Sequence, residues 1–319
     1  MTELNLIKGI FLKVYTDKNV QVFKEALSLL NEEGVRDGIF GFIYSDTNFS
    51  QEIVDNFLDK NPKMAIFKVV DMNKTDSMDN KLKFYLKMKD SKYTPTSFRN
   101  LEELKDNSFY QSYLENNNLF FLKDENGTLG KGVKVFKLKD LSDLTFKEDQ
   151  IIQKSMDNPA LINNRRFKLR ILVVIYKENL YFHKKYWGSI SKIEFNNNED
   201  DKERLKLMNI ITFGNGDPFF IDNIPHLNNI NNEIINSLKD IKKYYSEEIN
   251  NIKENLYTIL GLDYVISING SVEIVEINHR PNFWHGEHIT KKSDIKCIKD
   301  LYKLLINDSC FDTDFILIQ

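Results

Sequence analysis

Runs of apolar residues alternate with helical stripes in the first part of the chain. Residues 7–15, 39–44 and 64–70 are rich in β-branched and aromatic side chains, which is typical of buried strands. Apolar residues at helical spacing follow the first run at Val20, Phe23, Leu27 and Leu30, and precede the third at Ile53, Phe57 and Leu58. This alternation predicts a small N-terminal α/β domain over residues 1–92.

The second part of the chain is richer in predicted strands. Strands are expected at residues 119–123, 133–138 and 151–154, and a hairpin at residues 167–185. Residues 230–260 are predicted to be mostly helical, and residues 301–306 suggest a last helix. We divide this part into a domain over residues 93–155, which carries a glycine-bearing loop, and a domain over residues 156–319.

Two carboxylates are predicted to face each other near the C-terminus. Asn269-Gly270 separates two β-rich runs, and this dipeptide is a strong signal for a two-residue hairpin loop. Counting outward places Asp263 opposite Glu276, with Asn278 on the same face. Facing like charges repel, so such a group indicates a bound cation, and all-oxygen ligands favour Mg²⁺ or Mn²⁺. The alternative is two exposed carboxylates at a hairpin edge.

A glycine-bearing loop and a cationic strand precede this hairpin. Residues 124–132 contain three glycines between two predicted strands, and backbone N–H groups in such a loop can bind an anion. Arg166, Lys168 and Arg170 alternate along one face of a later strand, which suits a polyanion such as a triphosphate. Taken singly, the loop could be an ordinary turn and the strand a solvated edge. Together with the hairpin they are what a metal–nucleotide complex requires.

Composition narrows the classes of partner. The net charge of −3 gives no global field that favours nucleic acid. No apolar run reaches the roughly 18 residues that a membrane span needs. The first residues lack the features of a signal peptide, and the two cysteines, Cys297 and Cys310, are too few for a disulfide framework. We therefore expect a cytoplasmic protein that acts without nucleic acid or membrane; nothing in the sequence indicates its oligomeric state.

In this order the segments resemble the ATP-grasp superfamily and, within it, the tubulin–tyrosine ligase-like proteins. The resemblance runs from about Pro95 to about Pro281. Residues 151–170 are similar to the family segment QKYIxNPLLIxGRKFDLR, and residues 261–264 and 276–281 to its GFDF and EVNxxP elements. The resemblance implies an α+β ATP-grasp fold, in which two subdomains hold ATP between them, behind an N-terminal α/β domain.

The resemblance also implies roles for single residues. Lys123 and Lys154 would contact the phosphates and the adenine region of ATP, and Gln153 would lie in the adenine-binding segment. The loop that closes over the phosphates would use Gly127, Gly130, Lys131 and Gly132.

Further implied roles concern the γ-phosphate and the metal. Arg170 would stabilise the γ-phosphate, while Arg166 and Asn209 stand at nucleotide-contacting positions. The magnesium ligands would be Asp263, Glu276 and Asn278.

The chain departs from the family pattern on the substrate side. Lys168 replaces an acidic residue, His279 and Arg280 replace two small residues beside the metal site, and Lys206 and Met208 replace the His and Thr of an HLTN element. We expect Lys168 and Arg280, with the two arginines of the cationic strand, to act in catalysis. Added cations near the γ-phosphate favour an acidic or phosphorylated substrate.

The histidines and cysteines near the C-terminus have weaker interpretations. His279, His285 and His288 cluster with Trp284 and are expected at the rim of a substrate pocket, with a zinc site as the alternative. ATP-grasp chemistry needs no cysteine nucleophile, so both cysteines are expected to be bystanders.

The leading hypothesis is an ATP- and Mg²⁺-dependent ligase that joins an amine donor to a carboxylate. The carboxylate-bearing acceptor would be a protein, a peptide or a small molecule, activated as an acylphosphate. One alternative is a kinase of a polyol or inositol phosphate, whose substrate Arg165, Lys184, Lys185 and Arg280 could bind. The other is a pseudoenzyme that binds nucleotide without chemistry, against which the complete set of metal ligands argues.

Overall fold

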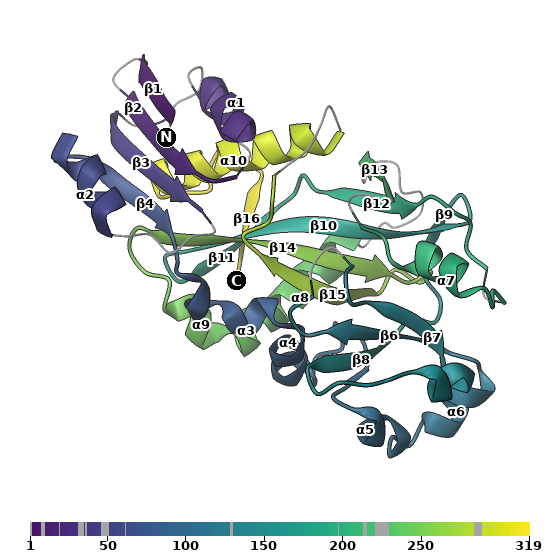
Figure 1. Ribbon diagram of the computed structural model, residues 1–319. Coiled ribbons are helices and arrows are strands. Elements are labelled where there is room, and N and C mark those ends of the chain that lie inside the picture. The colour runs from purple at the N-terminus through teal and green to yellow at the C-terminus, as the bar shows by residue number, and fades with distance from the viewer. Residues whose placement is uncertain are drawn as a thin grey trace.

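The chain forms a large lobe and a small lobe, each built on its own β-sheet (Figure 1). The computed structural model describes residues 2–7, 10–18, 20–30, 35, 37–45, 51–60, 62–127, 130–196, 198–212, 216–220, 230–283 and 289–319. Within these residues the large sheet has 12 strands and the small sheet has four.

The large sheet is mixed and follows the order β1-β2-β3-β4-β14-β10-β11-β16, with β9, β12, β13 and β15 paired beside this path. Its strands are β1 (Thr2–Ile7), β2 (Ile10–Thr16), β3 (Gly38–Tyr44), β4 (Ala65–Val69), β9 (Leu161–Ile162), β10 (Arg165–Tyr176), β11 (Asn179–His183), β12 (Trp187–Ser191), β13 (Gly216–Phe220), β14 (Leu256–Ile266), β15 (Val272–His279) and β16 (Phe315–Ile318). The strands β2, β3, β4 and β14 pair in parallel, and the other pairs are antiparallel.

The small sheet is antiparallel and lies within residues 93–155, the range predicted for the central domain. Its order is β5-β8-β6-β7, formed by β5 (Ser97–Phe98), β6 (Leu119–Asp124), β7 (Lys134–Lys137) and β8 (Gln150–Lys154). The helices α5 (Leu101–Lys105), α6 (Tyr110–Glu115) and η2 (Leu138–Asp143) complete this lobe. A core of its own, which includes Phe98, Leu104, Phe120 and Ile152, makes the lobe a separate packing unit.

Helices pack on both faces of the large sheet, with α8 in one core and α1 and α10 in the other. The described helices outside the small lobe are α1 (Val20–Leu30), α2 (Gln51–Lys60), η1 (Met72–Lys74), α3 (Asp76–Asp79), α4 (Lys81–Met88), α7 (Lys202–Asn209), α8 (Ile230–Tyr244), α9 (Ser246–Asn250) and α10 (Ile289–Asn307). None of the helices in the described part of the chain has the length and apolar character needed to cross a bilayer.

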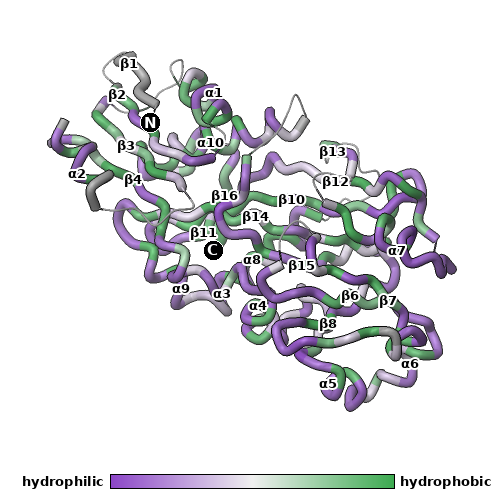
Figure 2. The backbone as a smooth tube through the Cα atoms, viewed as in Figure 1, coloured by the Kyte–Doolittle hydropathy of each residue, from purple (hydrophilic) through white to green (hydrophobic). Residues whose placement is uncertain are grey.

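The central strand β10 is buried on both faces, because its alternate side chains enter two different cores. Ile171 and Val173 share a core with residues of α8, whereas Leu172 and Val174 share one with residues of α1 and α10. Figure 2 shows hydrophobic segments through β10 and β14 and a mostly hydrophilic α7 at the edge. Each fully buried side chain of this kind contributes about 1.5 to 3 kcal/mol, so these strands fix the frame on which the site is built.

The N-terminal strands are part of the large sheet. The pairs Leu256↔Lys68 and Tyr257↔Val69 join β4 to β14, and α1 lies beside α10 (Figure 1), with which it shares a core. Strands β1 to β4, which were predicted to belong to a separate domain over residues 1–92, are therefore part of one sheet with the C-terminal part of the chain, and α1 shares a core with α10.

Two further predictions need adjustment. Residues 230–260 are helical only as far as Asn250, and residues from Leu256 onward form β14, because they insert between β4 and β10. The predicted last helix is the C-terminal end of α10, which is longer than expected. The hairpin of β10 and β11 is confirmed, with Lys177 and Glu178 as its two loop residues, both at positive φ.

Candidate functional site

A cavity lies between the small sheet and the part of the large sheet formed by β10, β14 and β15. A neighbouring cavity of about 400 Å³ shares Lys154, Ser155, Met156 and Arg166 with it. The predicted site residues in the lining of the first cavity are Lys123, Gly127, Gly130, Gln153, Lys154, Arg166, Lys168, Asn209, Asp263 and Glu276. Both lobes thus contribute to one site.

The hairpin of β14 and β15 places Asp263 opposite Glu276, so the predicted pairing is confirmed. The loop, however, holds three residues and not two, because the backbone N–H of Ser267 donates to the carbonyl of Ser271 at 2.9 Å. Gly270 closes this loop at a φ of +85°, a conformation that glycine adopts without strain. The extra loop residue shifts the pairing next to the loop by one position.

A β-bulge at Val275 restores the register. Tyr264 pairs with Ile274, and the next pair joins Asp263 to Glu276, which leaves Val275 as the extra residue. Ile274 packs in the core, whereas Glu273 and Glu276 both line the cavity although they are three residues apart. The signal for this bulge is the uneven spacing of the polar positions in β15.

Two cations from β10 hold Asp263. The Nζ atom of Lys168 lies 2.7 Å from Oδ2, and Nε of Arg170 lies 2.5 Å from Oδ1. Arg170 is the direct cross-strand neighbour of Asp263, and Lys168 points to the same face two residues earlier. Burial raises the pKa of Asp263, but the charges and hydrogen bonds of Arg170 and Lys168 more than offset this and lower it to about 2. Asp263 is therefore ionised at any physiological pH.

Lys81 connects this hairpin to the glycine-bearing loop, although the sequence analysis did not single it out. Its Nζ donates to the carbonyl of Gly127 at 2.6 Å and lies 3.1 Å from Oε1 of Glu276. Lys81 is the first residue of α4, and Asn80 caps that helix by accepting from the N–H of Lys83. This helix cap within a polar stretch is the only local signal we find for Lys81.

Lys123 and Gln153 meet across β6 and β8. The Nζ of Lys123 donates to Oε1 of Gln153 at 2.5 Å, and Gln153 donates from Nε2 to Oγ of Ser97 at 3.4 Å. Burial lowers the pKa of Lys123 to about 8. An anion bound beside it would favour the charged ammonium, so Lys123 suits a phosphate contact.

Arg166 joins β10 to the end of α7. Its Nη1 donates to Oγ of Ser155 at 3.1 Å and to Oδ1 of Asn209, and its guanidinium lies 5.2 Å from the ring centroid of Phe195. Asn209 is fixed in turn by donating from Nδ2 to the carbonyl of Leu205 at 2.8 Å. Burial lowers the pKa of Arg166 to about 10, so it keeps its charge at neutral pH.

The glycine-bearing loop lies only partly at the cavity. Gly127 and Gly130 line it, whereas Lys131 is exposed and, like Gly132, is absent from the lining. Residues 128–129 lie outside the described residues.

The donor set fits a divalent cation that arrives together with phosphates. Asn278 pairs with Gly261 and donates from Nδ2 to its carbonyl at 3.3 Å, so this hydrogen bond does not use its amide oxygen. The carboxylates of Asp263 and Glu276 line the cavity, whereas Asn278 is absent from the lining. These two carboxylates are already neutralised by Lys81, Lys168 and Arg170. Adding a divalent cation would therefore be electrostatically unfavourable unless anionic phosphates bound at the same time.

Comparison with known families shows the family to which the chain belongs. A family model described as the tubulin-tyrosine ligase family matches residues 44–210, which is more than half of the chain. The chain belongs to the tubulin–tyrosine ligase family. The matched range includes Lys81, Lys123 and Arg166 and ends before the hairpin of Asp263 and Glu276.

Members of this family from Tetrahymena thermophila are similar to the chain at low identity. The protein named tubulin glycylase 3B is 22% identical over 226 residues, and the probable alpha-tubulin polyglutamylase Ttll1 is 24% identical over 245 residues. The alignments cover 60% and 64% of the chain. The chain spans only 18% and 58% of these two relatives.

A solved structure establishes the fold. The C-terminal domain of Pby1 from K. lactis, described as an ATP-grasp enzyme interacting with the mRNA decapping enzyme Dcp2, matches with a TM-score of 0.62 at 15% identity. The match covers 97% of the chain and 98% of that domain. The predicted ATP-grasp fold is therefore confirmed.

The resemblance to tubulin–tyrosine ligases placed Lys168 on the substrate side of the site. In the structure Lys168 also forms an ion pair with Asp263. Lys168 lines the cavity, yet its ammonium is bound to Asp263. Of the HLTN replacements, Lys206 is exposed and Met208 is buried, so neither faces the cavity.

Arg280 does not lie where a catalytic residue was expected. Its side chain is buried and donates from Nη1 and Nη2 to the carbonyls of Ser45 and Val70, at the ends of β3 and β4. Arg280 is absent from the lining of the cavity and ties β15 to the N-terminal strands. This location corrects the expectation that it contacts substrate.

Other predicted residues are dispersed as well. Arg165 lies 3.5 Å from the carboxylate of Asp217, and Lys184 and Lys185 line a different cavity, so with Arg280 they form no common substrate pocket. His279 donates to or accepts from Thr75 through Nε2 at 2.7 Å, and burial lowers its pKa to about 3. Trp284, His285 and His288 lie outside the described residues.

Proposed function

We propose that the chain is an ATP- and Mg²⁺-dependent carboxylate–amine ligase acting on a protein or peptide. The observation that carries this proposal is the convergence of Lys81, Lys123 and Lys154 with the carboxylates of Asp263 and Glu276 in one cavity between two lobes. Membership of the tubulin–tyrosine ligase family supports it.

The reaction would proceed through an acylphosphate. A carboxylate oxygen of the acceptor attacks the γ-phosphorus of ATP, and the bond to the β–γ bridging oxygen breaks to release ADP. The amine nitrogen of the donor then attacks the acyl carbon, inorganic phosphate leaves, and the amine loses its proton to solvent or to the departing phosphate. Such a sequence depends on positioning and charge neutralisation more than on covalent work by the protein.

Each residue of the site has a role in this scheme. Lys123 and Lys154 would hold the phosphates, and Arg166 the nucleotide on the side of α7. Arg170 would keep Asp263 oriented. Asp263, Glu276 and Asn278 would hold magnesium, which would supply positive charge to the phosphates when bound.

Product analysis tests this proposal. The purified protein is incubated with ATP, Mg²⁺ and a lysate of its host, and proteins are searched by mass spectrometry for added amino-acid masses. We expect ADP and inorganic phosphate to accumulate together with amide-linked additions. A phosphorylated product without an added residue would identify a kinase instead, and the absence of any ATP-dependent product would contradict both activities.

A matched pair of variants tests the site. Lys81→Ala removes the ammonium between Gly127 and Glu276 and is expected to lower kcat/KM for ATP about 100-fold, which is typical for the loss of one charge-stabilising donor. Lys83→Ala, two residues along α4, breaks only an exposed ion pair with Asp76 and should leave kcat/KM unchanged. Equal kinetics for the two variants would remove Lys81 from the site.

A further inference from the structure

A second basic cavity lies where the end of β11 meets α10. Its volume is about 250 Å³. None of its lining residues belongs to the cavity between the two lobes, which we propose binds ATP and which we call the nucleotide cavity. The lining consists of Lys184, Lys185, Tyr186, Phe220, Lys292, Ser293 and Lys296. Four of these seven residues are lysines, which is an unusual density of one charge for so small a space.

Three of the lysines lack a counter-charge among the residues that the structure describes. Lys184, Lys185 and Lys292 are exposed, and within the described ranges their ammonium groups have no ion-pair partner. Like charges gathered around one cavity repel each other, and an anion bound among them would relieve that repulsion.

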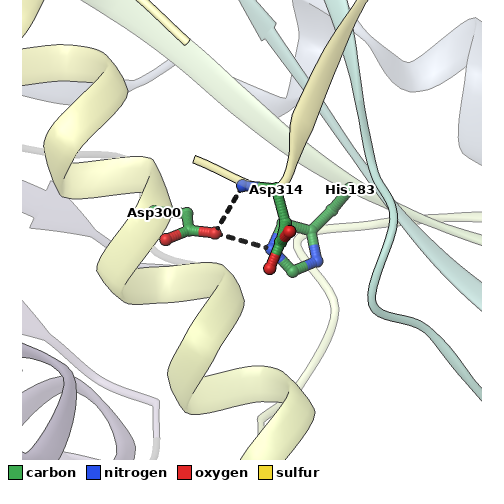
Figure 3. A group of neighbouring side chains, drawn as sticks. All are labelled: His183, Asp300 and Asp314. Atoms are coloured by element: carbon green, nitrogen blue, oxygen red, sulfur yellow. Dashed lines mark hydrogen bonds and ion pairs between the residues drawn. The ribbon is translucent and has the colours of Figure 1, made fainter. Parts of the chain in front are cut away.

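A buried acidic cluster fixes the fourth lysine. The Nζ of Lys296 lies 2.5 Å from Oδ2 of Asp300 and 3.0 Å from Oδ2 of Asp314. Asp300 is fully buried, and its Oδ2 also accepts from the backbone N–H of Asp314 at 2.9 Å (Figure 3). Burial lowers the pKa of Lys296, but the hydrogen bonds to both carboxylates more than offset this and raise it. Lys296 is therefore held in its charged form at the wall of the cavity, with its charge balanced by the two carboxylates.

The backbone that carries the other lysines is held just as firmly. The carbonyl of Lys185 accepts from Oγ of Ser293 at 2.9 Å and faces Nδ1 of His183 at 3.0 Å. The backbone N–H of Lys184 donates to the carbonyl of Asp314 at 2.9 Å. The segment that carries Lys184 and Lys185 is thus tied to α10 and to the start of β16, so the cavity is preorganised.

The cluster behind the cavity could itself suggest a metal site. His183, Asp300 and Asp314 offer ligand atoms within 4.8 Å of one another. Figure 3 shows these three side chains next to each other. The ammonium of Lys296, however, already contacts both carboxylates and supplies their counter-charge. We therefore interpret the cluster as the support of Lys296.

We propose that this cavity binds a compact phosphorylated ligand, with its phosphate oxygens against Lys184, Lys185, Lys292 and Lys296. A phosphate group carries about −1.5 to −2 charges and three acceptor oxygens at neutral pH. One or two phosphates can therefore balance the charges of Lys184, Lys185 and Lys292 within this volume, whereas separate carboxylates would each supply only a single charge. The proposal does not depend on which reaction the nucleotide site performs.

Calorimetric titration of the full chain with inorganic pyrophosphate tests the proposal. A saturating, non-hydrolysable ATP analogue fills the nucleotide cavity first, so that the probe reports on the second site. The double variant Lys184→Ala/Lys185→Ala should bind pyrophosphate at least tenfold more weakly than the unaltered protein. Lys105→Ala/Lys239→Ala removes the same number of charges from exposed positions on α5 and α8 and should bind as the unaltered protein does.

Two results would overturn the proposal. One is the absence of pyrophosphate binding once the nucleotide cavity is filled. The other is an equal loss of affinity in both double variants, which would show a non-specific effect of net charge.

A second titration distinguishes the sources of the phosphate. Tighter binding of a doubly phosphorylated serine peptide than of pyrophosphate would indicate a phosphorylated protein, and the reverse order a phosphorylated small molecule. A glutamate peptide of the same net charge should bind at least tenfold more weakly than the phosphopeptide. Equal binding of the two peptides would refute phosphate recognition in favour of a general acidic segment.

Discussion

Glu273 brings an ionisable group into the candidate site that no sequence motif marks. Burial raises its pKa to about 7, although Lys154 and Arg166 act in the opposite direction. Its position follows from the bulge at Val275, because counting by twos from Glu276 assigns Glu273 to the opposite face. An ionised Glu273 in this surrounding destabilises the folded protein above neutral pH.

The variant Glu273→Gln tests this effect. The ordinary pKa of a glutamate is 4.5, and that of Glu273 in the folded protein is about 7. Between these two pH values Glu273 keeps its proton in the folded wild type and has lost it in the unfolded chain. The free energy of unfolding of the wild type therefore falls as the pH rises through this window. The variant lacks this dependence. We therefore expect the free energy of unfolding of the variant, minus that of the wild type, to be about 1 to 3 kcal/mol larger at pH 8 than at pH 5. Urea unfolding at both pH values measures the change, and a pH-independent difference would argue against a raised pKa.

Residues reached through motifs and alternation were predictable from the sequence. Gln153, Lys154 and Asp263 belong to segments that resemble the family, and the structure brings all three to one cavity. Lys81 was not predicted as a site residue because it lies outside those segments and reaches the site from a helix. The contacts of Arg280 could not be anticipated, since its partners are backbone carbonyls distant in the sequence.

At the scale of elements, the glycine-bearing loop contacts the large lobe. Gly130 has a φ of +72°, and a Cβ at this position would lie 2.8 Å from Cγ2 of Thr212 and 2.9 Å from Cγ2 of Ile210. The loop therefore packs closely against the segment that follows α7, across the nucleotide cavity.

Gly130→Ala is expected to open this contact. The added methyl group and the strained φ should push the loop away from Thr212 and raise the dissociation constant for ATP about tenfold, or 1.4 kcal/mol by the usual conversion. Gly270→Ala is the control: Gly270 has a φ of +85° but no atom within 4 Å of the added Cβ. It should cost about 1 kcal/mol of stability and leave ATP affinity unchanged. Calorimetry and thermal unfolding separate the two effects, and identical ATP affinities would show that the loop contact has no role in binding.

The elements also show where sequence patterns succeed. Strand β10 was predictable because its apolar run is long and its hairpin loop is short. Strand β14 was partly mistaken for helix, since a short apolar run buried on both faces has no distinctive period. The hairpin pairing was right because a longer loop and a bulge, neither of which was predicted, offset each other.

At the scale of the whole molecule, Arg280 connects the nucleotide hairpin to the N-terminal strands. Parallel pairing between segments as distant as β4 and β14 leaves no local signal, so the sequence indicated a boundary where the sheet is continuous. Arg280 reinforces this junction by binding carbonyls at the ends of β3 and β4.

Arg280→Ala should therefore act on stability and not on substrate binding. Loss of a buried guanidinium leaves a cavity and two carbonyls without their donor, at a cost of about 3 to 5 kcal/mol. Thermal unfolding should occur at a lower temperature, while ATP affinity, measured where the variant is folded, should change less than threefold. Arg280→Lys keeps the charge but loses the two-armed donor geometry and should recover only part of the stability. If Arg280→Ala weakened ATP binding and left stability unchanged, Arg280 would have a role in the active site and not in the junction.

The bulge at Val275 means that ligand spacing alone does not describe this hairpin. A hairpin with a two-residue loop and no bulge would also place Asp263 opposite Glu276, so an alignment of the two carboxylates could not tell the forms apart. In that form, however, the side chains of residues 272–275 would change faces. Ile274 would then face the nucleotide, and Glu273 would lie among apolar side chains. Relatives that share the carboxylate spacing can therefore differ in which side chains their nucleotide meets, and grafting this hairpin onto another member of the family requires its loop and its bulge to be transferred together.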